Sequence, residues 1–103
     1  MASSREYLEF VLEQLSGLSE ITFRSMMGEY IIYHQGRIVG GIYANRFLVK
    51  PTESAKAIMP DAPLEAPYDG AKAMLLADVD NRDLLNQLIP AISNDLPAAK
   101  KRK

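Results

Sequence analysis

The stretch RSMMGEYIIYHQGRIVGGIYANRFLVK, residues 24–50, constrains the fold more than any other part of the chain. Branched and aromatic residues, which favour β-strands, fill three short segments, and residues that favour tight turns separate them. The predicted strands are residues 30–34, 37–43 and 47–50, and the predicted turns are residues 35–36 and 44–46. We therefore predict a three-stranded antiparallel meander.

The lengths of the two turns determine which side chains share a face of this meander. One face is expected to carry Tyr30, Ile32, Val39, Tyr43, Phe47 and Val49, and the other Ile31, Tyr33, Ile38, Ile42 and Leu48. A sheet with one face in water alternates apolar with polar residues, so two apolar faces imply that both are covered. Helices can cover one face. The other needs the proline-rich loop at 60–72, a second copy of the chain or a partner.

Helix signals flank the meander on both sides. A capping-box pattern of Ser3 and Glu6 predicts a first helix over residues 4–16. Asp80 is expected to cap a final helix, in which Pro90 should cause a kink or an end because its ring removes a backbone donor.

The remaining predicted elements are short. They are strands near residues 21–24 and 73–77 and a helix that begins after Thr52. The predicted fold class is α+β, with an antiparallel or mixed sheet built round the three-stranded meander and flanked by N-terminal and C-terminal helices. We expect one domain over residues 1–96, followed by a basic flexible tail at 97–103.

Composition excludes several kinds of chemistry. The chain has 103 residues and no cysteine, so it has no disulfide, no thiolate nucleophile and no cysteine-based zinc or iron–sulfur site. No apolar run approaches the roughly 20 residues that span a membrane, and the first residues include acidic side chains where a signal peptide would be basic. We therefore expect a cytoplasmic protein.

No combination of polar residues predicts catalysis. His34 is the single histidine, and a catalytic or metal-binding role would need partners that the sequence does not bring to it, so we expect a partly exposed structural histidine. Asp78, Asp80 and Asp83 lack the glycine and the distal glutamate of a calcium-binding loop. We predict a protein that is not an enzyme, with no catalytic residue, bound metal or cofactor.

A longer pattern runs through most of the chain. It consists of Met27-Gly28-x-Tyr30-x-Ile32-Tyr33-x-x-Gly36, then Leu48-x-Lys50, then Pro67-Tyr68 before a short strand and an acid-capped helix. This pattern resembles the N-terminal domain of the TfoX/Sxy family of competence regulators over residues 23–96. The segment Arg24-x-Met26-Met27-Gly28 is similar to the family's R-x-M-F-G-G signature, with Glu29 where a second glycine is usual. The resemblance implies a compact α+β fold, here as a stand-alone domain, and a link to competence, and it brings no catalytic residues.

Charge is distributed unevenly along the chain. The last four residues, Lys100, Lys101, Arg102 and Lys103, leave eight basic against thirteen acidic residues in the rest. An acidic body is a poor surface for nucleic acid, but the tail could add contacts that release at most about four counterions. A weak nucleic-acid accessory protein that acts through this tail is therefore one alternative function.

The leading functional hypothesis is a regulatory interaction module that docks on a protein partner or forms a homodimer. Its expected contact face consists of Tyr33, Ile38, Ile42 and Leu48. Another alternative is a small-molecule binder with a pocket between the 60–72 loop and the sheet. No membrane partner is expected.

Overall fold

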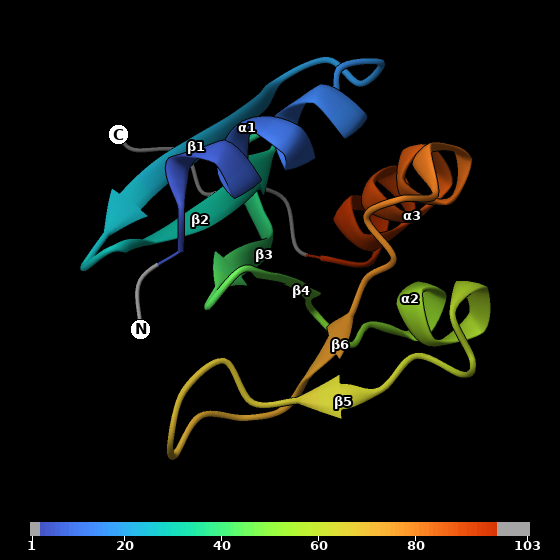
Figure 1. Ribbon diagram of the computed structural model, residues 1–103. Helices are drawn as coiled ribbons and strands as arrows, with labels where there is room; N and C mark the ends of the chain where they lie inside the picture. Colours follow the sequence, from blue (N-terminus) through green and yellow to red (C-terminus); the bar gives the residue numbers. More distant parts are fainter. Residues whose placement is uncertain (1–2, 97–103) are drawn as a thin grey trace, which may run out of the picture.

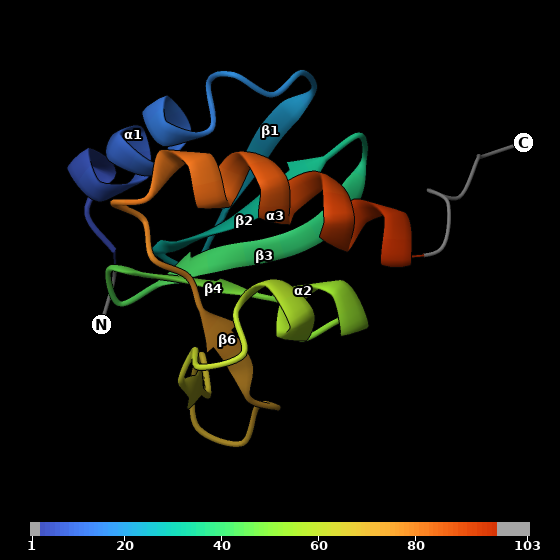
Figure 2. The same cartoon turned by 90° about the vertical axis from the view of Figure 1, so that its right-hand side faces the viewer.

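The computed structural model describes residues 3–96, which form one six-stranded antiparallel sheet with helices packed against it (Figures 1 and 2). The strand order is β1-β2-β3-β4-β6-β5, and strands β1 to β4 form a continuous meander. The strands are β1 (Ile21–Met26), β2 (Glu29–His34), β3 (Arg37–Tyr43), β4 (Arg46–Val49), β5 (Leu64–Glu65) and β6 (Met74–Leu76), and the helices are α1 (Arg5–Gln14), α2 (Glu53–Ile58) and α3 (Arg82–Asp95). The predicted α+β class is confirmed.

The main core lies between the helices and one face of the sheet. Helix α3 runs across β2 and β3, and α1 lies beside it near β1 (Figure 2). The core side chains are fully or almost fully buried, and burial of each large one contributes roughly 1.5–3 kcal/mol. Those with no exposed surface, apart from Ala55, are Leu8, Val11, Leu15, Ile32, Val39, Ile42, Phe47, Val49, Leu85, Leu88, Ile89 and Ile92.

A β-bulge in β3 makes the predicted register wrong. Ile32 pairs with Gly40 and Tyr33 with Ile38, so Val39 is an extra residue opposite β2. An extra residue reverses which side chains face the core from that point on. Ile42, expected on the other face, is therefore fully buried in the main core, and Tyr43 moves to the opposite face.

The β3–β4 hairpin also has a shorter turn than expected. Tyr43 pairs with Arg46, so only Ala44 and Asn45 form the turn, and both have positive φ, at 52° and 57°. Two residues in the left-handed region form the turn that matches strand twist best, and asparagine tolerates this conformation well.

Two helix caps and the role of one proline differ from the expectation. Ser4, not Ser3, caps α1 by accepting from the Tyr7 N–H, and Asn81, not Asp80, caps α3 by accepting from the Leu84 N–H. Helix α3 continues through Pro90 to Asp95. The buried residues on either side of Pro90 hold the helix on the sheet, which offsets a cost of about 3 kcal/mol.

The Glu29 carboxylate joins three segments that are distant in sequence. Its Oε1 accepts from the Ser3 hydroxyl at 2.6 Å, the Ser3 N–H at 3.0 Å and the Ala44 N–H at 3.3 Å. The chain before α1 is therefore tied to the β1–β2 and β3–β4 turns, two of the three hairpin turns of the meander, because Glu29 itself begins β2.

His34 links the end of β2 to the end of α3. It is only 5% exposed, so the expected partial exposure is wrong. Its Nδ1 lies 2.7 Å from the Oγ of Ser93, and that Oγ lies 3.3 Å from the His34 carbonyl oxygen. The Arg37 guanidinium donates to the Ser93 carbonyl oxygen at 2.7 Å, which places a cation at the C-terminal end of the helix, where its dipole is negative.

Within the part of the chain that the structure describes, none of the helices combines the length and apolar character that a membrane crossing requires.

Replacing Gly40 with alanine should destabilise the protein strongly. A Cβ at this position would lie 2.9 Å from the Val49 Cα and closer still to the Leu48 carbonyl oxygen, both backbone atoms that cannot rotate away. We expect Gly40→Ala to cost about 1–3 kcal/mol in urea unfolding. The matched control is Gly17→Ala, whose Cβ would make only an ordinary contact, 3.6 Å, with the Asn86 side chain. Equal stability of the two variants would contradict the close packing of β3 on β4.

The buried His34 should make stability fall on mild acidification. Burial lowers the pKa of His34 below 6.5; Glu20 opposes this effect and Arg37 adds to it. The unfolded chain therefore takes up a proton first, and stability that is complete above pH 6.5 is lost as pH falls from 6.5 to the lower folded-state pKa. We expect His34→Asn to flatten the slope of unfolding free energy between about pH 7 and pH 5, where one proton contributes at most about 1.4 kcal/mol per pH unit. Parallel slopes for the two proteins would refute this assignment.

Candidate interaction sites

The face of the sheet that points away from α1 and α3 carries an apolar groove. We call it the second-face groove; its volume is about 520 Å³, and it lies between the sheet and the segment that runs from Pro67 to Met74. Strands β1 to β3 contribute Met26, Ile31, Ile38, Gly40 and Tyr43, and Lys50 and Pro51 follow β4. The segment contributes Pro67, Tyr68, Ala71, Lys72 and Ala73, and Met74 at the start of β6 completes the lining. The 60–72 loop, expected to cover this face, covers only part of it.

Two tyrosines form one wall of this groove. The rings of Tyr43 and Tyr68 meet edge to face with their centroids 6.4 Å apart. The Tyr43 ring lies directly over Gly41, where a Cβ would be only 2.7 Å from a ring carbon. Burial raises the pKa of Tyr43, and Tyr68 and Glu29 raise it further, so its hydroxyl stays a neutral donor at physiological pH.

A second hollow of about 300 Å³ extends the groove towards the first hairpin turn. It shares Met26, Tyr43, Pro67 and Tyr68 with the groove and adds Met27 and Glu29. The Met27 side chain at the turn is 96% exposed. Methionine is flexible and polarisable, which suits contact with surfaces of varied shape.

Apart from Glu29 in the hollow that extends it, the groove is lined by basic charged side chains. Lys50 and Lys72 line it, whereas the ion pairs among residues 3–96 are Arg5–Glu9 and Arg46–Glu65. Neither lysine therefore pairs with a carboxylate in the described part of the chain. An occupant with acidic groups would complement this charge.

The residues predicted for the contact face do not share one environment. Ile38 is 40% exposed and lines the groove, and Tyr33, its partner across the strands, is half-buried. Leu48 alternates with the core residues of β4 but is itself fully buried. Ile42 belongs to the core, whereas Tyr43 and Met26, which were not predicted for this face, line the groove. In the sequence, the glycine pair at 40–41 is typical of a β-bulge. The bulge exchanges the faces of the sheet on which Ile42 and Tyr43 lie.

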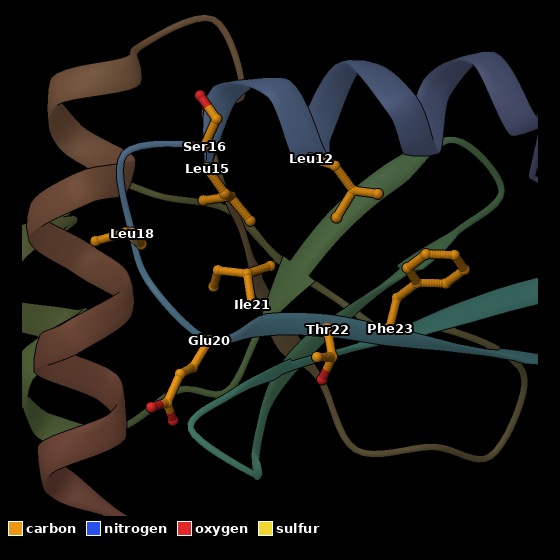
Figure 3. A pocket seen from close by; sticks show the side chains of 8 residues that line it. All are labelled: Leu12, Leu15, Ser16, Leu18, Glu20, Ile21, Thr22 and Phe23. Carbon is orange, nitrogen blue, oxygen red and sulfur yellow. The ribbon is translucent and has the colours of Figure 1, made fainter.

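A different groove lies at the free edge of the sheet, between α1 and β1 (Figure 3). We call it the edge groove; its volume is about 560 Å³. Ile21 and Phe23 point from β1 towards α1, whereas Glu20 and Thr22 point to the other side of the strand (Figure 3). Leu12, Leu15, Ser16 and Leu18 complete the lining.

His34 and Ser93 form the close imidazole–hydroxyl pair of the described residues. His34 and Ser93 are close enough to form a nucleophile–base pair, but Ser93 is 1% exposed and neither residue lines a cavity described above, so a substrate has no access. Among residues 3–96, no cluster of three or more His, Asp or Glu side chains could hold a metal ion. The predicted basic residues Lys100, Lys101, Arg102 and Lys103 lie outside the described range.

Comparison with known proteins places the chain in a family. The family model described as the TfoX N-terminal domain matches residues 13–84. An uncharacterised 12.7 kDa protein encoded in the trpE 5′ region of Spirochaeta aurantia is 32% identical over 105 residues, which cover 100% of this chain and 91% of the relative. No solved structure matches the chain significantly. The chain therefore belongs to the TfoX N-terminal domain family, a regulatory family associated with competence.

Proposed function

We propose that this protein is a non-catalytic regulatory module that acts by docking a protein partner in the second-face groove. The observation that carries the proposal is an apolar groove on a sheet face that the chain's own loop covers only in part. Ile38, Met26 and Tyr68 remain 40%, 48% and 65% exposed there. Side chains of these kinds lose water favourably at the centre of a protein interface, where methionine and tyrosine are enriched.

The shape and charge of the groove favour an extended peptide segment with apolar and acidic residues. The groove lies across the strands, with Met26 in β1 and Met74 in β6 among its lining residues. Lys50 and Lys72 would meet acidic groups of such a segment, mainly improving selectivity and the rate of association. The family association supports a role in transcriptional or competence regulation through such contacts.

Nucleic acid fits this surface less well. Sheets that bind single strands combine aromatic side chains with a groove rich in lysine and arginine. Here the walls between the two lysines are mostly apolar, with Ile31, Ile38 and Met74 among them. Phosphates would gain few partners along such walls.

A small apolar ligand is the second candidate, because a volume of about 520 Å³ lies within the range of small-molecule sites. Occupancy of the groove by a ligand would raise the melting temperature, and Tyr68→Asp would abolish that shift. A screen of small carboxylates by thermal shift measures this directly.

Site-specific photo-crosslinking tests the docking proposal. A benzoylphenylalanine in place of Ile38 should crosslink to a defined protein in cells of the natural host, because this position lies inside the proposed interface. The matched control places the same residue at Gln87, an exposed position on α3, on the opposite side of the sheet. Tyr68→Asp should remove the Ile38 crosslink without unfolding the chain, since Tyr68 is largely exposed. Identical crosslinks from both positions, or none from position 38, would refute the proposal.

A further inference from the structure

Strand β1 ends the sheet with an unprotected edge. Within residues 3–96, β1 pairs with β2 on one side and no other strand pairs with its outer side. Its six residues include five that are exposed, and it carries no proline and one charged residue, Arg24. Long edge strands usually carry several such protections against pairing with another chain, so this edge is open to a further strand.

The backbone groups available on this edge can be identified. The Glu20 carbonyl oxygen accepts from the Gln35 N–H at 3.0 Å, and Met26 and Glu29 flank a two-residue turn. In an antiparallel pair, residues that bond to the neighbouring strand alternate with residues that point away from it. Even-numbered residues of β1 therefore bond to β2, and the N–H and C=O groups of the odd-numbered residues point outward: Ile21, Phe23 and Ser25.

We propose that two copies of this chain pair through β1 in an antiparallel, two-fold symmetric dimer centred on Phe23. In this register Phe23 lies opposite Phe23 of the second copy, and Ile21 lies opposite its Ser25. Each of these pairs joins outward-pointing residues, so each can exchange two backbone hydrogen bonds. A single surface meeting itself is the usual geometry of a closed dimer.

Charge selects this register over its neighbour. Arg24 would lie opposite Thr22 of the second copy, with two diagonal neighbours within reach of a long side chain: Glu20, just before that copy's β1, and its Arg24, which is farther than in a direct pair. Glu20 and Thr22 point to the same side of the strand (Figure 3), and Arg24 shares that side because it alternates with Phe23. A shift by one residue in each copy would centre the dimer on Arg24 and place the two Arg24 side chains opposite each other, which is unfavourable.

The edge groove gives the second copy an apolar surface to cover. Phe23 is 37% exposed and is held in place by the Tyr30 ring, with centroids 5.9 Å apart, and by the Arg5 guanidinium, 5.7 Å from the ring centre. An added strand would continue the sheet beneath α1, and its Phe23 would lie next to the groove that Leu12 and Leu15 line. Aromatic pairs across strands add roughly 0.2–1 kcal/mol to pairing.

This proposal does not rest on the docking proposal, because none of the outward-pointing residues of β1 and none of the edge-groove residues lines the second-face groove. A single pair of short strands buries an area at the low end for protein interfaces, so the dimer should be weak. We expect a dissociation constant in the range of about 10 µM to about 1 mM.

Sedimentation equilibrium over about 10 µM to about 2 mM tests the proposal, with amide exchange by NMR on the same samples. The expected result is a reversible monomer–dimer equilibrium. The amides of Phe23 and Ser25 should gain protection as concentration rises, whereas those of Thr22 and Arg24 should be protected throughout. A chain that stays monomeric at the highest concentration overturns the proposal, as does a dimer in which Phe23 and Ser25 gain no protection.

Two kinds of variant make the test specific. Ser25→Pro removes an outward N–H without removing a bond to β2, and it should weaken the dimer at least tenfold. Arg24→Glu should also weaken it by placing like charges together, and adding Glu20→Arg should restore it by exchanging the charges. These exposed charge variants keep the test decisive if the proline variant fails to fold. Dimerisation that ignores Arg24→Glu but is lost in Ile38→Asp would place the interface at the second-face groove and overturn pairing through β1.

Discussion

The extra residue at Val39 is the constraint on which the rest of this structure depends. It places Val39 and Gly40 together opposite Ile32, so every later side chain of β3 changes face relative to a regular strand. Ile42 then completes the core beside Phe47, its partner in β4. Without the bulge, Tyr43 would point into the core and the groove would lose the aromatic wall that it forms with Tyr68. One inserted residue therefore gives the protein both a filled core and a surface that is available for binding.

The two glycines after the bulge make this arrangement possible for different reasons. At Gly40 the backbone of β4 leaves no space for a Cβ, and at Gly41 the Tyr43 ring occupies the space that a side chain would take. The turn that follows is held from outside, because Glu29 accepts from the Ala44 N–H and Asn45 accepts from the Ser4 N–H. The bond to the Glu29 carboxylate is charge-assisted, and such bonds are stronger than neutral ones. Glu29 stands where the family pattern usually has glycine, so in this chain a carboxylate ties the hairpin turns to the start of α1.

The sequence predicted the elements of this fold better than the relations between them. The α+β class, the meander and the flanking helices follow from periodicity and turn residues, which act locally. The strand register could not be predicted in the same way. A bulge is a local irregularity, and it changes which side chains face the core only when β2 and β3 pair. The caps at Ser4 and Asn81 differed by one residue from the expected positions, since several adjacent polar residues compete to cap each helix. The course of α3 through Pro90 also depends on tertiary packing. Of the expected contact face, Ile38 lines the groove, whereas Ile42 is a core residue for the same reason that the register differed.

The two proposed surfaces are geometrically linked through β1. Phe23 and Ile21 belong to the helix-covered side of this strand, whereas Met26 lines the second-face groove on its other side. Antiparallel pairing of two β1 strands has its two-fold axis perpendicular to the sheet, so both second-face grooves would lie on the same side of the joined sheet. A partner with two suitable segments could then occupy the second-face groove of both copies. Once one segment is bound, the other is held at a high effective concentration near the groove of the other copy, so dimerisation would increase the affinity for such a partner. Binding at both grooves would in turn stabilise the dimer, because each equilibrium must favour the other by the same factor.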